Sequence, residues 1–469
     1  MATVKKETII RNLQIVDISA EGKGIGKHEG LVIFVEGAVP GDVADVMVYR
    51  KKSHLAEARI QSLITPSIFR TGPVCSHFGS CGGCKWQHLA YRQQLQFKQK
   101  QVRDALERIG KLEFGDILPI LPNQEPYFYR NKLEFSFSNK RWFTQREFAQ
   151  KENLSPNALG FHVPGMFDKV LDIEECHLQP APSNEIRLAI KNFALENNYS
   201  FYDVRAKQGF LRTLIIRNTN IGELMVLISV FEREEKNLFA LLEFLKNKFP
   251  HITSLQYVHN PKGNDTLEGL QPQVFYGRDY IKEEMEGLSF KVSAKSFFQT
   301  NSAQAYHLYK IVRGFAALKG NELVYDLYTG TGTIANFISK NAKKIIGIEY
   351  VKEAIDDAKE NSAANRIDNT LFFSGDIKDI MNPDFVEQYG KPDVVITDPP
   401  RAGMHPDVVN RLLELQPEKI VYVSCNPATQ ARDLALMKDF YVLKKIQPVD
   451  MFPQTSHVEN VVLLERKKG

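Results

Sequence analysis

The stretch that decides the fold is residues 322–350, which read ELVYDLYTGTGTIANFISKNAKKIIGIEY. It contains an apolar strand, a glycine turn, a helical segment and a second apolar strand. The alternation continues through further apolar segments: TLFFSGD (370–376), DVVITDPP (393–400), KIVYVSC (419–425) and NVVLLER (460–466). Continuous apolar strands that alternate with helices indicate a parallel, doubly wound sheet. Ligands of such sheets bind at the carboxyl ends of the strands, so the residues just after each strand are candidates for a site.

Acidic residues stand at the ends of four successive strands: Asp326, Glu349, Asp376 and Asp398. Each alone is typical of a helix cap, but the four together favour a nucleoside pocket. We expect Glu349 to accept hydrogen bonds from ribose hydroxyls and Asp376 to meet an adenine amino group. The turn TGTGT (329–333) lacks a third glycine and a phosphate-binding lysine, which argues against dinucleotides and nucleoside triphosphates. S-Adenosylmethionine fits best, because it has no phosphates and its sulfonium is positively charged.

A cysteine, Cys425, follows the strand KIVYVS and precedes an Asn-Pro pair. A buried cysteine is usually an inert apolar side chain, but this one is expected at the ligand edge of the sheet. A thiolate that adds to C6 of uracil makes C5 nucleophilic toward a methyl donor, and we expect a polar pocket to lower the thiol pKa. The C5 proton must then leave to a general base. The segment DMFPQTSHVEN (450–460) offers Glu459, with His457 as the weaker candidate; the alternative role for Glu459 is to cap or salt-bridge the strand end.

The chain has 469 residues, too many for one ordinary core, and we expect three domains. Residues 1–66 read as a small antiparallel, OB-like β-barrel whose glycine-rich loop at 21–30 is suited to RNA. Residues 67–283 read as a mixed α+β domain. Its clearest elements are the strands KLEFSFS (132–138), KVLDI (169–173), LRTLIIRN (211–218) and ELMVLISVF (223–231), and the helix EKNLFALLEFLKNKF (235–249). Residues 284–469 form the doubly wound α/β domain.

The formal net charge is only +4, so the placement of the charge matters more than its sum. Basic residues gather between positions 85 and 110, against only Asp104 and Glu107: Lys85, Arg92, Lys98, Lys100, Arg103 and Arg108. On a helix, these residues and the glutamines between them predict a donor-rich face suited to phosphates. A solvated surface helix is the equally weighted alternative.

Four cysteines lie far from the predicted nucleophile: Cys75, Cys81, Cys84 and Cys176. An odd and unevenly spaced total of five argues against a disulfide framework. Sets of four thiolates suit an iron–sulfur cluster or zinc. Zinc sites usually show two paired knuckles, whereas Cys176 is unpaired; His77, His88 and His177 keep a Cys/His zinc site open. Either group would have a structural role, since nothing indicates redox turnover.

Several of these motifs together resemble the RNA (uracil-5)-methyltransferase family, most closely its bacterial 23S rRNA branch. The matching segments are SCNPAT with ARD (424–429 and 431–433), DMFP through Glu459, DPPRAG (398–403) and SFFQTN (296–301). The resemblance spans nearly the whole chain. It implies a Rossmann-like methyltransferase domain at the C-terminus and a TRAM module, an RNA-binding OB-like domain, at the N-terminus.

The resemblance also implies roles for individual residues. Cys425 is expected to be the nucleophile and Glu459 the base. Four residues are expected to bind S-adenosylmethionine, with Thr333 and Asp376 as weaker contacts: Gln299, Tyr328, Glu349 and Asp398. In the resembling rRNA enzymes the pattern of Cys75, Cys81, Cys84 and Cys176 holds a 4Fe–4S cluster. The stretch YRNK (129–132) resembles, loosely, an RNA-contacting segment.

We therefore expect methylation of uridine C5 in 23S rRNA. The alternatives are the same chemistry on tRNA or on more than one rRNA uridine, an RNA-binding assembly factor with a vestigial site, and amino-methylation through the Asp-Pro-Pro loop, which leaves Cys425 without a role. Phe297, Phe298 and Phe452 are candidates for packing a flipped-out base, although we expect at least one of them in the core. No long apolar run and no secretory signal at residues 1–8 are evident. We therefore expect a monomeric, cytoplasmic protein that binds neither membrane nor DNA.

Overall fold

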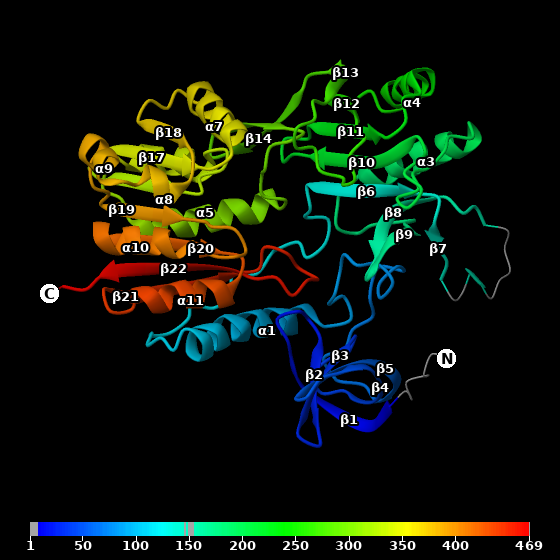
Figure 1. The fold of residues 1–469 in the computed structure, drawn as a ribbon, viewed down its shortest axis with the longest axis horizontal. Coiled ribbons are helices and arrows are strands. Elements are labelled where there is room, and N and C mark those ends of the chain that lie inside the picture. The colour runs from blue at the N-terminus through cyan, green and yellow to red at the C-terminus, as the bar shows by residue number, and fades with distance from the viewer. Residues whose placement is uncertain (1–7, 145–146, 149–153, 469) are drawn as a thin grey trace.

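The computed structural model describes residues 8–144, 147–148 and 154–468 and contains three main β-structures (Figure 1). Residues 1–7, on which the expectation about a secretory signal partly depends, lie outside the described residues. Among the helices described, none is long and apolar enough to cross a membrane.

The N-terminal structure is a closed barrel of five strands in the order β1-β2-β3-β5-β4. The strands are β1 (Thr8–Ile18), β2 (Gly24–His28), β3 (Leu31–Glu36), β4 (Val43–Lys51) and β5 (Leu55–Thr65). Alternate apolar side chains such as Ile33 and Val35 fill its interior. The predicted barrel is confirmed, with one difference: β3 and β5 pair in parallel, because β4 lies between them in the chain and pairs with β1 and β5.

A second sheet has eight strands in the order β13-β12-β11-β10-β6-β8-β9-β7. Its strands are β6 (Lys132–Ser138), β7 (Arg141–Trp142), β8 (Ala158–Val163), β9 (Met166–Asp172), β10 (Leu211–Asn218), β11 (Leu224–Val230), β12 (Ser254–His259) and β13 (Gln273–Gly277). The helices α3 (Ser183–Glu196) and α4 (Glu235–Lys248) pack on it through one apolar core. The four strands and the helix expected in this region are therefore confirmed.

The C-terminal sheet has seven strands in the order β18-β17-β16-β19-β20-β22-β21. They are β16 (Leu323–Leu327), β17 (Lys344–Glu349), β18 (Thr370–Ser374), β19 (Val394–Thr397), β20 (Lys419–Ser424), β21 (Tyr441–Val449) and β22 (Glu459–Arg466). The strands from β18 to β20 are parallel, which confirms the doubly wound pattern. β22 runs antiparallel to both of its neighbours, a direction that its apolar pattern did not reveal.

Helices cover both faces of this sheet. One face carries α5 (Ser302–Ala316), α6 (Thr333–Ile338) and α7 (Lys352–Ala364). The other carries α8 (Ile377–Ile380), α9 (Pro383–Tyr389), α10 (Pro406–Leu415) and α11 (Pro427–Met437). Successive strand residues supply opposite cores, as Val324 and Tyr325 do in β16. Because β17 and β19 lie on either side of β16, the chain reverses its direction of winding there, which is where such sheets bind ligands.

Two elements join the three structures. The hairpin of β14 (Tyr280–Met285) and β15 (Leu288–Ser293) packs into the core beside α5. The helix α1 (Tyr91–Asp104) lies against α11 and β21, between the C-terminal sheet and the barrel (Figure 1). The expected domain boundaries stay predictions: the first follows β5, and the second, at 283/284, falls within β14.

The phosphate-binding face expected on α1 is only partly available. Gln94 and Lys98 are buried, and Lys98 forms an ion pair with Asp450 at 2.5 Å. Lys100 is half-exposed but pairs with Asp17 and Asp104. The middle of the predicted donor face therefore serves packing and internal pairing, because Gln94 and Lys98 are hydrogen-bonded to residues 450–454.

Candidate functional site

The predicted site residues gather at one edge of the C-terminal sheet. Tyr328 follows β16, Glu349 ends β17, and Asp376 and Asp398 come just after β18 and β19. Cys425 follows β20. β22 is antiparallel to β20 and pairs Asn460 with Ser424, so Glu459 begins β22 at the edge where β20 ends. The sheet topology thus brings the predicted nucleophile and base together from positions 34 residues apart (459 minus 425).

The turn after β16 has a backbone that favours glycine. Gly330 and Gly332 have φ angles of 56° and 72°, and Tyr328 has a φ of 60°. A Cβ atom added to Gly332 would lie 2.9 Å from the Cβ of Ala358. Gly332 therefore permits both the left-handed turn and the close approach of α6 to α7. Thr333 is buried as the first residue of α6.

Two acids brace this turn. Asp326 is buried and accepts a hydrogen bond from the Thr329 hydroxyl at 2.5 Å. Glu349 accepts the N–H groups of Gly330 (3.2 Å) and Val351 (3.0 Å), one with each carboxylate oxygen. A carboxylate has about four lone-pair positions, so Glu349 retains acceptor capacity for hydroxyl groups.

Asp376 has the capping role that the sequence had left open. It is the N-cap of α8 and accepts the N–H of Lys378 at 3.2 Å. It also lines a cavity of about 430 Å³ beside Tyr328, so capping and ligand contact are compatible. The other lining residues are Tyr350, Ile377, Pro400, Ala402, Gly403, Met404, His405, Pro406, Val408 and Arg432. The walls of this cavity are largely apolar, which suits a flat ring.

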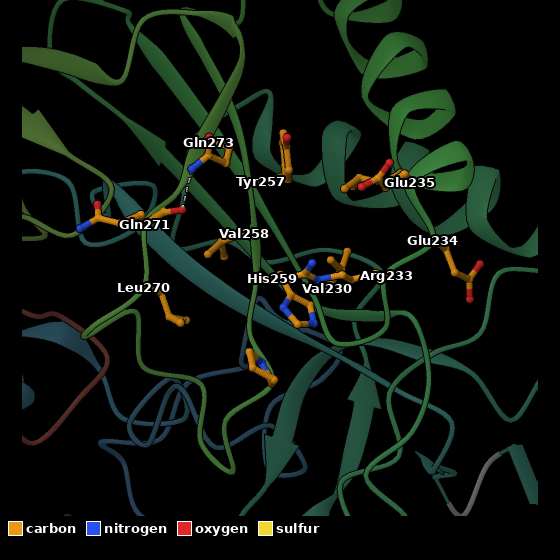
Figure 2. A pocket seen from close by; sticks show the side chains of 12 residues that line it. Val230, Arg233, Glu234, Glu235, Tyr257, Val258, His259, Leu270, Gln271 and Gln273 are labelled. Carbon is orange, nitrogen blue, oxygen red and sulfur yellow. Dashed lines mark hydrogen bonds between the residues drawn. The ribbon is translucent and has the colours of Figure 1, made fainter.

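A second cavity, of about 440 Å³, lies between α4 and the ends of β11 and β12 (Figure 2). Arg233, His259 and Gln273 are among the side chains that line it. It contains none of the predicted site residues and belongs to the central sheet. We therefore do not assign the reaction to it.

The groups around Cys425 hold their protons tightly. Burial, followed by the charges of Glu459 and Asp398, raises the pKa of the Cys425 thiol to about 11, while Arg401 opposes the shift. The lowered thiol pKa expected from the sequence is therefore wrong, because the thiol is buried and Glu459 and Asp398 add to the shift. Burial and the charge of Asp398 raise the pKa of Glu459 to about 8. Burial and the charge of Asp326 raise the pKa of Asp398 to about 7.

His457 is the weaker base by its electrostatics. Desolvation and the positive charge of Arg401 lower its pKa to about 4. Glu459 is only 7% exposed and, once ionised, is the stronger proton acceptor.

The sequence did not reveal Tyr309, which is buried near these acids. Desolvation, followed by the charges of Asp398, Asp326 and Glu459, raises its pKa.

The loop that leads to Glu459, residues 450–458, is hydrogen-bonded to side chains of α1. Lys98 donates to Asp450 at 2.5 Å and to the carbonyl of Phe452 at 3.0 Å, and Tyr91 donates to Asp450 at 2.7 Å. Gln94 exchanges hydrogen bonds with Gln454. No motif in the sequence had connected α1 with this loop.

The three aromatic candidates for base packing differ in environment. Phe298 is 4% exposed and packs on Phe290, as expected of at least one of them. Phe297 is 70% exposed, and Phe452 is half-buried beneath the guanidinium of Arg130, 5.6 Å from its ring centre. Gln299 lies in the loop between β15 and α5 and is half-buried.

The four remaining cysteines lie within electrostatic reach of one another. Burial raises the pKa of Cys81 to about 11 and that of Cys84 to about 12, and the charges of the neighbouring thiolates add to both shifts. Cys176 and Cys75 are also raised in pKa by burial. In the part of the chain that the structure describes, no group of three or more His, Cys, Asp or Glu side chains is placed to hold a single metal ion. A metal group at these cysteines therefore stays a prediction.

Residues 269–467, which include the C-terminal sheet, match a known protein family. The sequence pattern of the family described as tRNA (Uracil-5-)-methyltransferase matches residues 269–467. An uncharacterized RNA methyltransferase from Bacteroides thetaiotaomicron is 58% identical over 452 residues, which cover 96% of this chain and all of the relative. Another from Chlorobaculum tepidum is 42% identical over 466 residues, covering 97% of this chain and 96% of the relative.

A solved structure is similar along nearly the whole chain. It is the tRNA (uracil-54, C5)-methyltransferase of Pyrococcus abyssi in complex with S-adenosyl-L-homocysteine. The TM-score is 0.75 at 28% sequence identity, and the match covers 97% of this chain and 100% of that one.

Proposed function

This chain belongs to the RNA (uracil-5-)-methyltransferase family and is an S-adenosylmethionine-dependent RNA methyltransferase, and from this premise we propose that it methylates C5 of a uridine in 23S rRNA through a covalent bond between Cys425 and the base. The observation that carries the proposal is the meeting of Cys425 and Glu459 at the edge where β20 ends and β22 begins. Amino-methylation gives neither residue a role.

The thiolate of Cys425 adds to C6 of the uracil ring, and the C5–C6 electron pair moves toward C5. S-Adenosylmethionine supplies an electrophilic methyl group, and its positive sulfonium favours ionisation of nearby acids and thiols. The electron pair at C5 attacks the methyl carbon of this donor, so the C5–CH3 bond forms as the S–CH3 bond breaks. The S–CH3 electrons stay on sulfur, and S-adenosylhomocysteine is the leaving group. Glu459 then takes the C5 proton, the C5–H electrons restore the double bond, and the Cys425 thiolate leaves. A carboxylate whose pKa is about 8 is suited to this proton transfer.

On the donor side, the proposal assigns Gln299, Tyr328, Glu349 and Asp398 to S-adenosylmethionine. Glu349 has free acceptor positions for ribose hydroxyls, and the cavity beside Tyr328 suits the adenine ring. Thr333 and Asp376 are the weaker contacts; Asp376 lines the same cavity. Asp398, with a pKa of about 7, lies near both Asp326 and Cys425, where its negative charge favours a sulfonium.

A second candidate substrate is tRNA, which the names of the matching family and of the Pyrococcus abyssi enzyme favour. Labelled donor and separate pools of 23S rRNA and tRNA distinguish the two substrates. The proposal predicts methyl transfer to 23S rRNA and none by Cys425→Ala, with donor binding retained. Transfer to tRNA alone would reject the rRNA assignment, and full activity of Cys425→Ala would reject the covalent route.

The four cysteines Cys75, Cys81, Cys84 and Cys176 are proposed to hold a 4Fe–4S cluster with a structural role. Four thiols suit thiolate-bound iron, and N–H groups are directed at their sulfur atoms, as Gly83 is at Cys81 at 3.4 Å. A four-iron cluster also separates its ligands more widely than a single ion does. Iron and acid-labile sulfide in the purified protein, and their loss in Cys81→Ser, test this assignment; iron-free protein prepared without oxygen would reject it.

The barrel of β1–β5 is proposed to be an RNA-binding TRAM module. The support is its closed five-stranded form and its position next to α1, which connects it to the catalytic sheet. Deletion of residues 1–66 is expected to weaken binding of the RNA and leave donor binding unchanged, measured by filter binding and calorimetry. Unchanged RNA affinity would contradict this role.

A further inference from the structure

A short segment of the chain, residues 128–131, lies between the two loops that carry the proposed donor-binding and base residues. We call the loop at 294–301, which contains Gln299, the donor loop, and the loop at 450–458, which leads to Glu459, the base loop. We propose that Tyr129 and Asn131 are positioning residues, each holding one of these loops in its working place. This inference rests on the proposed function and adds two residues to it.

Tyr129 contacts the base loop. Its hydroxyl donates to the carbonyl oxygen of Pro453 at 2.9 Å. The next residue, Arg130, lies over the ring of Phe452. Glu459 is six residues beyond Pro453 (459 minus 453), so the Tyr129 hydroxyl fixes the path of the loop that leads to Glu459.

Asn131 contacts the donor loop at two points and Ser302, the first residue of α5, at a third. Its backbone N–H donates to the carbonyl of Thr300 at 2.9 Å, and its side-chain NH₂ donates to the carbonyl of Gln299 at 3.0 Å and to the hydroxyl of Ser302 at 2.7 Å. Asn131 is 5% exposed. The loose resemblance of this stretch to an RNA-contacting segment therefore does not hold for Asn131, whose side chain is used inside the protein.

The segment itself is anchored to the central sheet and to the cysteine region. The N–H groups of Phe128 and Arg130 donate to the carbonyls of His177 and Leu178, which directly follow Cys176. The carbonyl of Asn131 accepts the N–H of Asn218 at the end of β10. Segment 128–131 is thus held by backbone hydrogen bonds to the central sheet and to the residues after Cys176.

The two loops also touch each other. Asn301 of the donor loop donates to the carbonyl of Met451 at 2.8 Å, and Gln304 in the adjoining helix α5 donates to that of Asp450 at 3.1 Å. Direct contact keeps the loops together, while Tyr129 and Asn131 set where each lies relative to the central sheet. Changing one of the two residues should consequently disturb one function and spare the other.

The test compares Tyr129→Phe with Asn131→Ala in the full chain. Loss of one neutral hydrogen bond changes an equilibrium by about 2- to 13-fold. Tyr129→Phe is expected to lower turnover by about 5-fold, to leave the Kd for S-adenosylhomocysteine unchanged, and to increase the fraction of RNA joined to protein on denaturing gels, because proton removal from C5 slows. Asn131→Ala is expected to raise that Kd by about 10-fold without accumulating the adduct.

The matched control is Tyr127→Phe, which removes a hydroxyl from the residue just before segment 128–131. Among the described residues, no hydrogen bond joins the Tyr127 side chain to either loop, unlike the side chains of Tyr129 and Asn131. It should match the wild type in all three measurements. Ser302→Ala is the milder variant of the donor-loop contact, with an expected rise in Kd of about 3-fold, and it replaces Asn131→Ala if that protein does not fold.

The pattern of effects decides the inference. Adduct that accumulates only in Tyr129→Phe, together with a Kd that rises only in Asn131→Ala, supports it. Equal loss of both functions in the two variants, or loss of thermal stability alone, overturns it. Failure of the wild type to methylate uracil would instead reject the proposed function, and the Kd measurements would still judge the role of Asn131.

Discussion

The buried ion pair between Lys98 and Asp450 offers a sharp test of how α1 supports the base loop. Both side chains are fully buried, and their charged atoms are 2.5 Å apart. We predict that Lys98→Met strongly destabilises this region, because the Asp450 carboxylate is left in the protein interior with the Tyr91 hydroxyl as its remaining side-chain donor among the described residues.

The magnitude follows in two ways. Removing one partner of a buried pair costs about 3–5 kcal/mol. The Asp450 carboxylate can instead take up a proton in the folded protein. At pH 7 this is about three pH units above the ordinary pKa of an aspartate in the unfolded chain, so the free energy of unfolding falls by about 4 kcal/mol. If Asp450 is protonated in this way, the loss of stability should shrink by about 1.4 kcal/mol for each pH unit of acidification.

The assay is equilibrium unfolding in urea followed by the fluorescence of Trp86. Trp86 is buried, 5.9 Å from the Lys98 ammonium, and Trp142→Phe removes the only other tryptophan. The matched control is Lys100→Met on the same helix, whose half-exposed ion pairs are worth about 1 kcal/mol or less. Lys98→Met combined with Asp450→Asn should be more stable than Lys98→Met alone, because no charge is left buried.

Equal penalties for Lys98→Met and Lys100→Met would refute this reasoning. So would a double variant whose loss equals the sum of the two single losses, since that result excludes coupling between the side chains.

Three further predictions concern the site. Glu459→Gln should reduce turnover by about 100- to 10,000-fold and trap methylated RNA on the protein, seen on denaturing gels; rapid release of product would exclude Glu459 as the base. Because its pKa is raised to about 8, the active ionised form is present above that pH and lost below it, so product release should rise with pH up to about 8 and then level off; a rate that falls over this range would contradict the assignment. Gly332→Ala should cost about 1–2 kcal/mol in backbone strain and weaken S-adenosylhomocysteine binding, measured by thermal unfolding and calorimetry; unchanged binding would show that the turn does not shape the donor pocket.

The sequence predicted which residues lie at the site's edge of the C-terminal sheet, because that placement depends on local patterns of apolar and polar residues. Apolar strands end in polar residues, and parallel strands bring their carboxyl ends together, so Tyr328, Glu349 and Asp398 were placed correctly at one edge. Strands β6 and β10 also have the bounds that their apolar patterns indicate. The antiparallel direction of β22 was not evident, because an apolar strand has the same composition in either direction.

Contacts between residues that are far apart in the chain could not be predicted from the sequence, for a physical reason. Lys98 and Asp450 are separated by 352 positions, and neither residue alone differs in pattern from a surface charge. Asn131 likewise resembled a surface residue, yet it is buried against the donor loop. The pKa of the Cys425 thiol also depends on the folded environment: burial raises it, and Glu459 and Asp398 from other parts of the sheet edge add to the shift, which the sequence motifs did not reveal.

The most direct measurement of the central claim uses RNA that contains 5-fluorouridine. Fluorine cannot leave C5 as a proton does, so the route through Cys425 predicts a stable adduct of protein and RNA that requires the methyl donor and disappears in Cys425→Ala. Absence of an adduct in an enzyme that methylates ordinary RNA, or an adduct that persists in Cys425→Ala, would contradict the account.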